Sequence, residues 1–82
     1  MDYYTRTGLD YRQREMITFC YIAAQGGCEP QLTVHAAANM GIGNDKQFLI
    51  DVISQCLPYI GYPRSLNALT CVNSAAKQFE LN

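Results

Sequence analysis

The single histidine of the chain, His35, lies in a stretch whose residue types suit acid–base or thiol chemistry. Cys28 precedes it by seven positions and Gln31 by four. Residues separated by three, four or seven positions share a helix face, so these three side chains are expected on one side of a helix, with Cys28 at its first turn. Imidazole can donate or accept a proton near neutral pH, and the dipole at a helix start favours a reactive thiolate. This face is the candidate site.

The helix that carries His35 is predicted to begin at Pro30, which suits the first helical position. Gly41 suits the position just past its end. Another helix precedes it: Asp10 and Gln13 have the capping-box spacing, and the pattern continues to the glycine pair at 26–27. Met16, Phe19, Cys20 and Ala23 form one apolar face of this helix, and Ile17, Tyr21 and Ala24 form another. We therefore expect it to be central to the fold.

Two more helices are predicted after residue 43. Residues 44–47 show a second capping-box pattern, and the strongest helical periodicity follows it at Leu49, Val52, Ile53, Cys56, Leu57 and Ile60. Pro58 is expected to kink or end this helix just before Gly61, and the last helix is expected from Pro63 to about Phe79. No stretch has the pattern of a strand. The predicted fold is a single all-α domain over residues 1–82, a bundle of about four helices with a lead-in at residues 1–9.

Composition limits the partners of this domain. The chain has 82 residues, of which 49% are hydrophobic and 16% charged, more apolar surface than so small a core can hide. We therefore expect a homo-oligomer. A net charge of −1 without a basic run argues against nucleic acid, and no apolar run approaches the roughly 18 residues of a membrane span. Without a signal pattern, a cytoplasmic protein is expected.

The remaining cysteines and charged residues have structural explanations too. Cys20, Cys56 and Cys71 are expected to be buried free thiols rather than disulfide partners, and one histidine with scattered cysteines and carboxylates does not predict a metal site. The first turn with Arg12, Arg14 and Glu15 is either a solvated helix start or a carboxylate held by arginines near the His35 helix. His35 itself could be a core or interface histidine, and Cys28 could fill an apolar gap.

Several motifs in the same order resemble the carboxymuconolactone decarboxylase family over roughly residues 9–76. They are Arg14-Glu15, Glu29-Pro30-Gln31-Leu32 leading to His35, Gly41, and Tyr59-Ile60-Gly61-Tyr62-Pro63-Arg64 followed by Leu66-Asn67-Ala68-Leu69. The resemblance implies an alkylhydroperoxidase-like helical fold, assembly as trimers or hexamers with sites near subunit contacts, a small-molecule substrate and no cofactor.

The decarboxylase branch of this family keeps the Glu-Pro-Gln-Leu run before the histidine. The resemblance then implies a lyase that acts on a small carboxylated lactone or related acid, with His35 as acid or base and Glu15 setting its tautomer. Arg64 or Arg14 would hold the substrate carboxylate, and Leu32 or Tyr62 would form an apolar wall. Gln31 completes the substrate-binding candidates. Alternatively, Tyr59, Tyr62 and Arg64 simply pack the corner between the last two helices.

The peroxidase branch carries a Cys-x-x-Cys motif before the histidine. Cys28 matches its first cysteine, but Gln31 replaces the second, and the interval from Glu15 to His35 is one residue longer. A peroxide reductase using Cys28 is the alternative function, and it needs a resolving thiol from elsewhere in the fold or from another subunit. The third alternative is an oligomeric binding module without catalytic activity.

Overall fold

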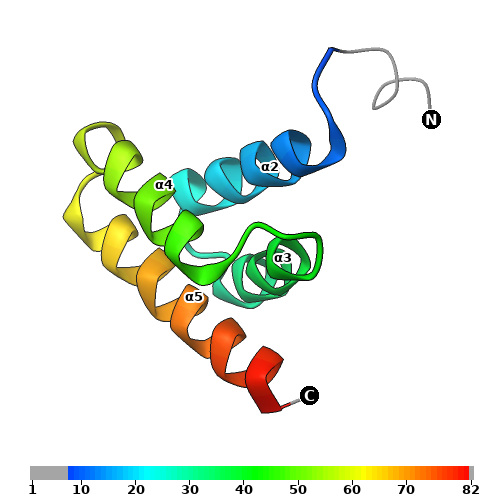
Figure 1. The fold of residues 1–82 in the computed structure, drawn as a ribbon. Helices are drawn as coiled ribbons and strands as arrows, with labels where there is room; N and C mark the ends of the chain where they lie inside the picture. Colours follow the sequence, from blue (N-terminus) through cyan, green and yellow to red (C-terminus); the bar gives the residue numbers. More distant parts are fainter. Residues whose placement is uncertain (1–7, 82) are drawn as a thin grey trace.

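The chain folds into four helices in the computed structural model, which describes residues 8–81 (Figure 1). They are α2 (Tyr11–Gln25), α3 (Glu29–Gly41), α4 (Lys46–Ile60) and α5 (Tyr62–Leu81). Residues 8–81 contain no strand, which confirms the all-helical prediction. Residues 1–7 of the predicted lead-in lie outside the described residues, and no helix of residues 8–81 is long and apolar enough to cross a membrane.

The helix starts show where local sequence signals held and where they did not. The capping box of α2 is present, with Gln13 N–H donating to Asp10 Oδ1 at 2.8 Å and Asp10 N–H donating to Gln13 Oε1 at 3.0 Å. The box predicted at residues 44–47 is wrong. Asp45 caps α4 by accepting from Phe48 N–H at 2.9 Å. Asn44 does not cap the helix. Its side chain is buried, and its amide bonds to α2 and α3.

The other helix boundaries differ from the predictions by one or two residues. Helix α3 begins one residue before Pro30 and includes Gly41, while α5 begins one residue before Pro63 and reaches Leu81. Helix α4 continues for two residues beyond Pro58 and ends at Ile60, with Gly61 as its C-cap.

Helix α5 is the most extensively packed helix, since α3 and α4 both make their largest helix contacts with it. Helix α2 packs mainly on α3. Small residues line its buried side: Ala68 and Ala75 are fully buried, as is Val72. Alanines let neighbouring helices approach closely. Phe19 of α2 and Leu49 of α4 are the largest fully buried side chains of the core. The packing of α2 on α3 then sets the position of His35, on α3, relative to α2.

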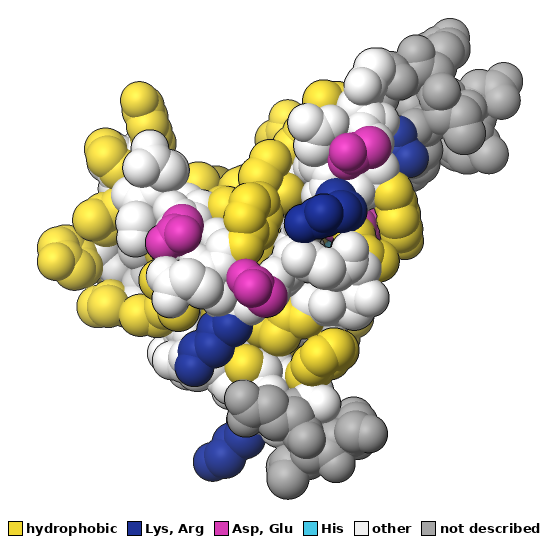
Figure 2. All heavy atoms as spheres, in the orientation of Figure 1, with side chains coloured by type: hydrophobic (Ala, Val, Ile, Leu, Met, Phe, Trp, Pro, Cys, Tyr) yellow, Lys and Arg dark blue, Asp and Glu magenta, His cyan; other side chains and the backbone are white. Residues whose placement is uncertain are grey.

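Helix α2 is less central than its apolar pattern suggested. Its first apolar face is partly or fully buried, but on the second face Tyr21 is 73% exposed and Ala24 is exposed. Tyr59 and Tyr62, at the corner between α4 and α5, are 88% and 66% exposed. Figure 2 shows hydrophobic side chains gathered over that end of the molecule, at the left of the view. The second apolar face of α2 is therefore largely exposed in the single chain, although the helix was expected to be central to the fold.

Candidate functional site

The structure brings together Glu15 of α2 and His35 of α3. Glu15 Oε1 lies 3.8 Å from His35 Nδ1, and the two side chains are 18% and 35% exposed. At this separation the atoms are within ion-pair range, and a small rotation would bring them to hydrogen-bond distance. His35 Nδ1 is buried without a hydrogen-bond partner among the described residues. A carboxylate facing Nδ1 favours the tautomer with its proton there, which leaves Nε2 to exchange a proton with a ligand.

A buried amide fixes the two helices at this point. Asn39 lies one turn after His35 and is fully buried. Its Nδ2 donates to the His35 carbonyl at 2.8 Å and to the Glu15 carbonyl at 3.2 Å. The amide thus binds the backbone of both candidate catalytic residues. It is a positioning residue that sequence reasoning missed, although a single amide on an otherwise apolar stretch of helix was a signal for it.

A second amide and a guanidinium extend the hydrogen bonds of Asn39, which we call the Asn39 brace. Asn44 Nδ2 donates to Asn39 Oδ1 at 2.8 Å and to the Arg12 carbonyl at 3.0 Å, while Arg12 Nε donates to Asn44 Oδ1 at 3.1 Å. Arg12 also donates to the Gly43 carbonyl at 3.2 Å. Arg12 therefore joins the start of α2 to the loop after α3. The interpretation of this turn as only a solvated helix start does not account for these bonds. These bonds fix the register of α2 against α3.

Cys28 is the N-cap residue of α3 and is partly buried, but its side chain makes no capping hydrogen bond. The Cys71 thiol of α5 donates to the carbonyl of Glu29, the residue after Cys28, at 3.6 Å. Cys71 is 4% exposed, as a buried free thiol was predicted to be. A second thiol therefore lies against the first turn of α3, at the residue that follows Cys28.

The four predicted substrate-binding residues are spread over several elements. Tyr62 is at the exposed start of α5, and Gln31 is exposed on the first turn of α3. Arg14 is partly buried, and its Nη1 donates to the Leu9 carbonyl at 2.6 Å. Arg64 crosses over Gly26 at the α2–α3 corner: a Cβ built on Gly26 would lie 2.7 Å from Arg64 Nε. Of the two predicted apolar walls, Leu32 is 3% exposed and belongs to the core.

The Gly26 corner gives the first prediction. Gly26 has φ 76° and ψ 158°, a combination that almost only glycine adopts, so Gly26→Ala is expected to lower the free energy of unfolding by about 1–3 kcal/mol. Denaturant unfolding measures this. Gly27→Ala, with φ 74° and open space around the new Cβ, separates backbone strain from displacement of Arg64. Gly41→Ala, in a helix with open space, is expected to be neutral or stabilising. Equal stability of the Gly26 variant and the wild type would contradict the assignment.

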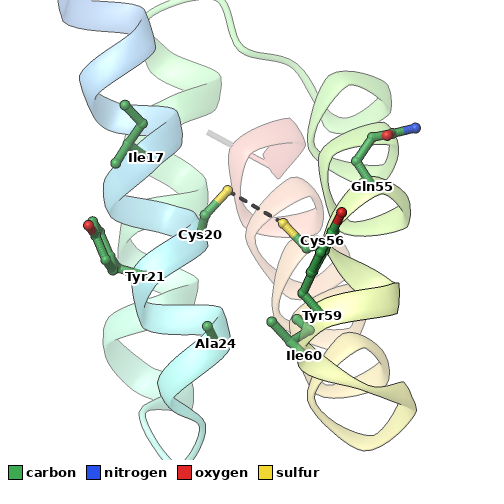
Figure 3. A pocket seen from close by; sticks show the side chains of 8 residues that line it. All are labelled: Ile17, Cys20, Tyr21, Ala24, Gln55, Cys56, Tyr59 and Ile60. Atoms are coloured by element: carbon green, nitrogen blue, oxygen red, sulfur yellow. Dashed lines mark hydrogen bonds between the residues drawn. The ribbon is translucent and has the colours of Figure 1, made fainter.

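Sequence reasoning also missed a thiol pair between α2 and α4. Cys20 and Cys56 point toward each other, and Cys56 Sγ donates to Cys20 Sγ at 3.8 Å (Figure 3). Burial, together with the neighbouring Cys56, raises the pKa of the Cys20 thiol to about 12. Both are free thiols, as predicted, yet only partly buried. Within residues 8–81, no three His, Cys, Asp or Glu side chains gather as a metal site would require.

The four helices of residues 8–81 fit the all-helical fold that the resemblance implied. The chain belongs to the carboxymuconolactone decarboxylase family, since the sequence model of that family matches residues 1–74. Neither a search of curated proteins nor a search of solved structures gave a match.

Proposed function

We propose that the protein is a cofactor-free lyase that decarboxylates a small carboxylated lactone or a related acid, with His35 as its acid–base residue. The proposal rests on the contact of Glu15 Oε1 with His35 Nδ1 at 3.8 Å, beside an imidazole that stays 35% exposed. A histidine that served only to fill the core would be sealed from ligands. This one is oriented on one side by a carboxylate and is open on the other.

Besides the histidine, the proposed reaction needs one cationic side chain. Loss of carbon dioxide leaves an electron pair on the substrate carbon, which must take up a proton. In the proposed mechanism His35 Nε2 supplies that proton, and Glu15 faces Nδ1 on the other side of the imidazole. A cation must first hold the substrate carboxylate. Arg64 is the cation proposed for that role, and its side chain extends across the α2–α3 corner at Gly26.

A second copy of the chain would complete this site. On the outer side of α3, Val34 is 65% exposed and Gln31 is exposed, next to the partly exposed His35. Covering Val34 and Gln31 would remove water from around His35 and strengthen its electrostatic contacts. This supports the proposal of a homo-oligomer, as the family resemblance implied.

One observation favours a second candidate, a peroxide reductase that uses Cys28. Cys71 Sγ lies 3.6 Å from the carbonyl of Glu29, the residue after Cys28. In that reaction the Cys28 thiolate attacks a hydroperoxide, giving an alcohol and a sulfenic acid. The Cys71 thiol then displaces water from the sulfenic sulfur and forms a disulfide, which an external dithiol reduces.

Parallel assays of the wild type and two thiol variants separate these functions. We expect carbon dioxide release from carboxymuconolactone by the wild type and, at a similar rate, by Cys28→Ser and Cys71→Ala. The same three proteins are assayed for consumption of an organic hydroperoxide with a dithiol present. Peroxide turnover that disappears with Cys28→Ser, without lactone turnover, would replace the lyase by the peroxidase. Inactivity in both assays would leave the non-catalytic binding module.

A further inference from the structure

We propose that Cys20 and Cys56 form a thiol–disulfide exchange site, which reduces an uncharged low-molecular-weight disulfide and becomes a cross-link between α2 and α4. The two sulfur atoms are 3.8 Å apart and face each other from neighbouring helices. Figure 3 shows that no side chain drawn there stands between them. A disulfide needs the sulfurs at about 2.05 Å, a closure of less than 2 Å that side-chain rotation and a small helix shift can supply.

The pair is accessible from the surface. Two hollows of about 400 and 410 Å³ flank it, and both are lined by Cys20, Cys56 and Gln55. The first is otherwise lined mainly by apolar and aromatic side chains, including Ile17, Tyr21 and Tyr59. The second is lined by Met16, Phe48 and Val52 among others, and it too is almost wholly apolar. An apolar lining favours a small neutral disulfide over an anionic one such as glutathione disulfide.

The exchange balances in two steps. The Cys56 thiolate attacks one sulfur of the small disulfide, forms a mixed disulfide and releases one thiolate. The Cys20 thiol then attacks the Cys56 sulfur, and its proton goes to the second departing thiolate. Two protein thiols and one small disulfide thus become one protein disulfide and two small thiols. The raised pKa of Cys20 supports this division of roles, because the Cys20 thiol stays protonated at neutral pH.

Mass spectrometry tests the cross-link. The Cys28→Ser, Cys71→Ala chain, incubated with hydroxyethyl disulfide, is expected to lose the mass of two hydrogens. Trypsin cuts after Arg14, Lys46 and Arg64, so Cys20 and Cys56 fall in peptides 15–46 and 47–64, which should be joined. If the double variant does not fold, the wild type serves, with tandem mass spectrometry to distinguish Cys20 from Cys28 within peptide 15–46. An unreacted chain, or a mixed disulfide that persists without a cross-link, would overturn the proposal.

Single variants test the order of the two thiols. In the same background, Cys20→Ser is expected to keep a stable mixed disulfide on Cys56, because the second thiol is missing. Cys56→Ser is expected to leave Cys20 unreacted at neutral pH. Glutathione disulfide should cross-link the parent chain at least several-fold more slowly than hydroxyethyl disulfide. A mixed disulfide on Cys20 instead of Cys56, or faster reaction with glutathione disulfide, would contradict the assigned roles.

Discussion

Replacing His35 by alanine is expected to lower kcat/KM for the decarboxylation by about 10²–10⁴-fold, the range that a positioned proton donor contributes. The reason is geometric: Glu15 faces Nδ1 of His35, and the imidazole remains partly open to a ligand. The measurement is the initial rate of carbon dioxide release over a range of substrate concentrations. Because His35 acts on the reacting carbon rather than in holding the substrate, the loss should appear mainly in kcat.

Matched variants show whether the effect is catalytic. Asn73→Ala changes an exposed position on α5 and should keep near wild-type activity. Glu15→Gln keeps the shape of the side chain but loses its charge, so it should lower activity less than His35→Ala does. The double variant should be about as slow as His35→Ala alone, since Glu15 acts through His35. A folded His35→Ala protein with wild-type turnover, or additive losses in the double variant, would contradict these roles.

The fold was largely predictable from local signals. Apolar periodicity, the Asp10 capping box and the positions of Gly26 and Gly61 each describe a single segment, and helices are built from such segments. Asn44 shows the limit. Its spacing to Gln47 predicts a cap, but Asn39 and Arg12 bind its amide, and Asp45 caps the helix instead. A side chain that can cap locally or bridge distantly is assigned only by the tertiary structure.

The candidate site was predictable only in part, for the same reason. Sequence spacing placed Glu15 and His35 on separate helices but left open whether they meet, and the structure brings Glu15 Oε1 to 3.8 Å from His35 Nδ1. No pattern could pair Cys20 with Cys56, because 36 positions separate them and the pairing depends on how α2 lies against α4. Nor did the pattern show that Tyr59 and Tyr62 face outward. Periodicity identifies an apolar face, but it does not say whether the same chain or a second copy covers it.

The Asn39 brace gives the largest expected change in stability. Asn39→Ala removes three hydrogen bonds from a fully buried amide: those to the His35 and Glu15 carbonyls, and the one from Asn44. At about 1 kcal/mol each, with a small cavity added, the free energy of unfolding should fall by roughly 3–4 kcal/mol. Denaturant unfolding measures it. Asn73→Ala, an exposed amide on α5, is the control and should change stability little.

The Asn39→Asp variant distinguishes the hydrogen bonds of this amide from its volume, because its effect depends on pH. The amide nitrogen donates to two carbonyl oxygens, and an ionised carboxylate in its place would face them with negative charge. Burial and this repulsion favour the protonated carboxyl in the folded state, so its folded pKa lies above the unfolded value of about 3.9. The folded state then binds more protons, and stability is lost as pH rises from about 4 through the folded pKa. Unfolding midpoints relative to the wild type, measured at several pH values, should therefore fall with rising pH. A midpoint difference that does not change with pH would mean that Asn39 only fills space, and that the register of Glu15 against His35 depends on other contacts.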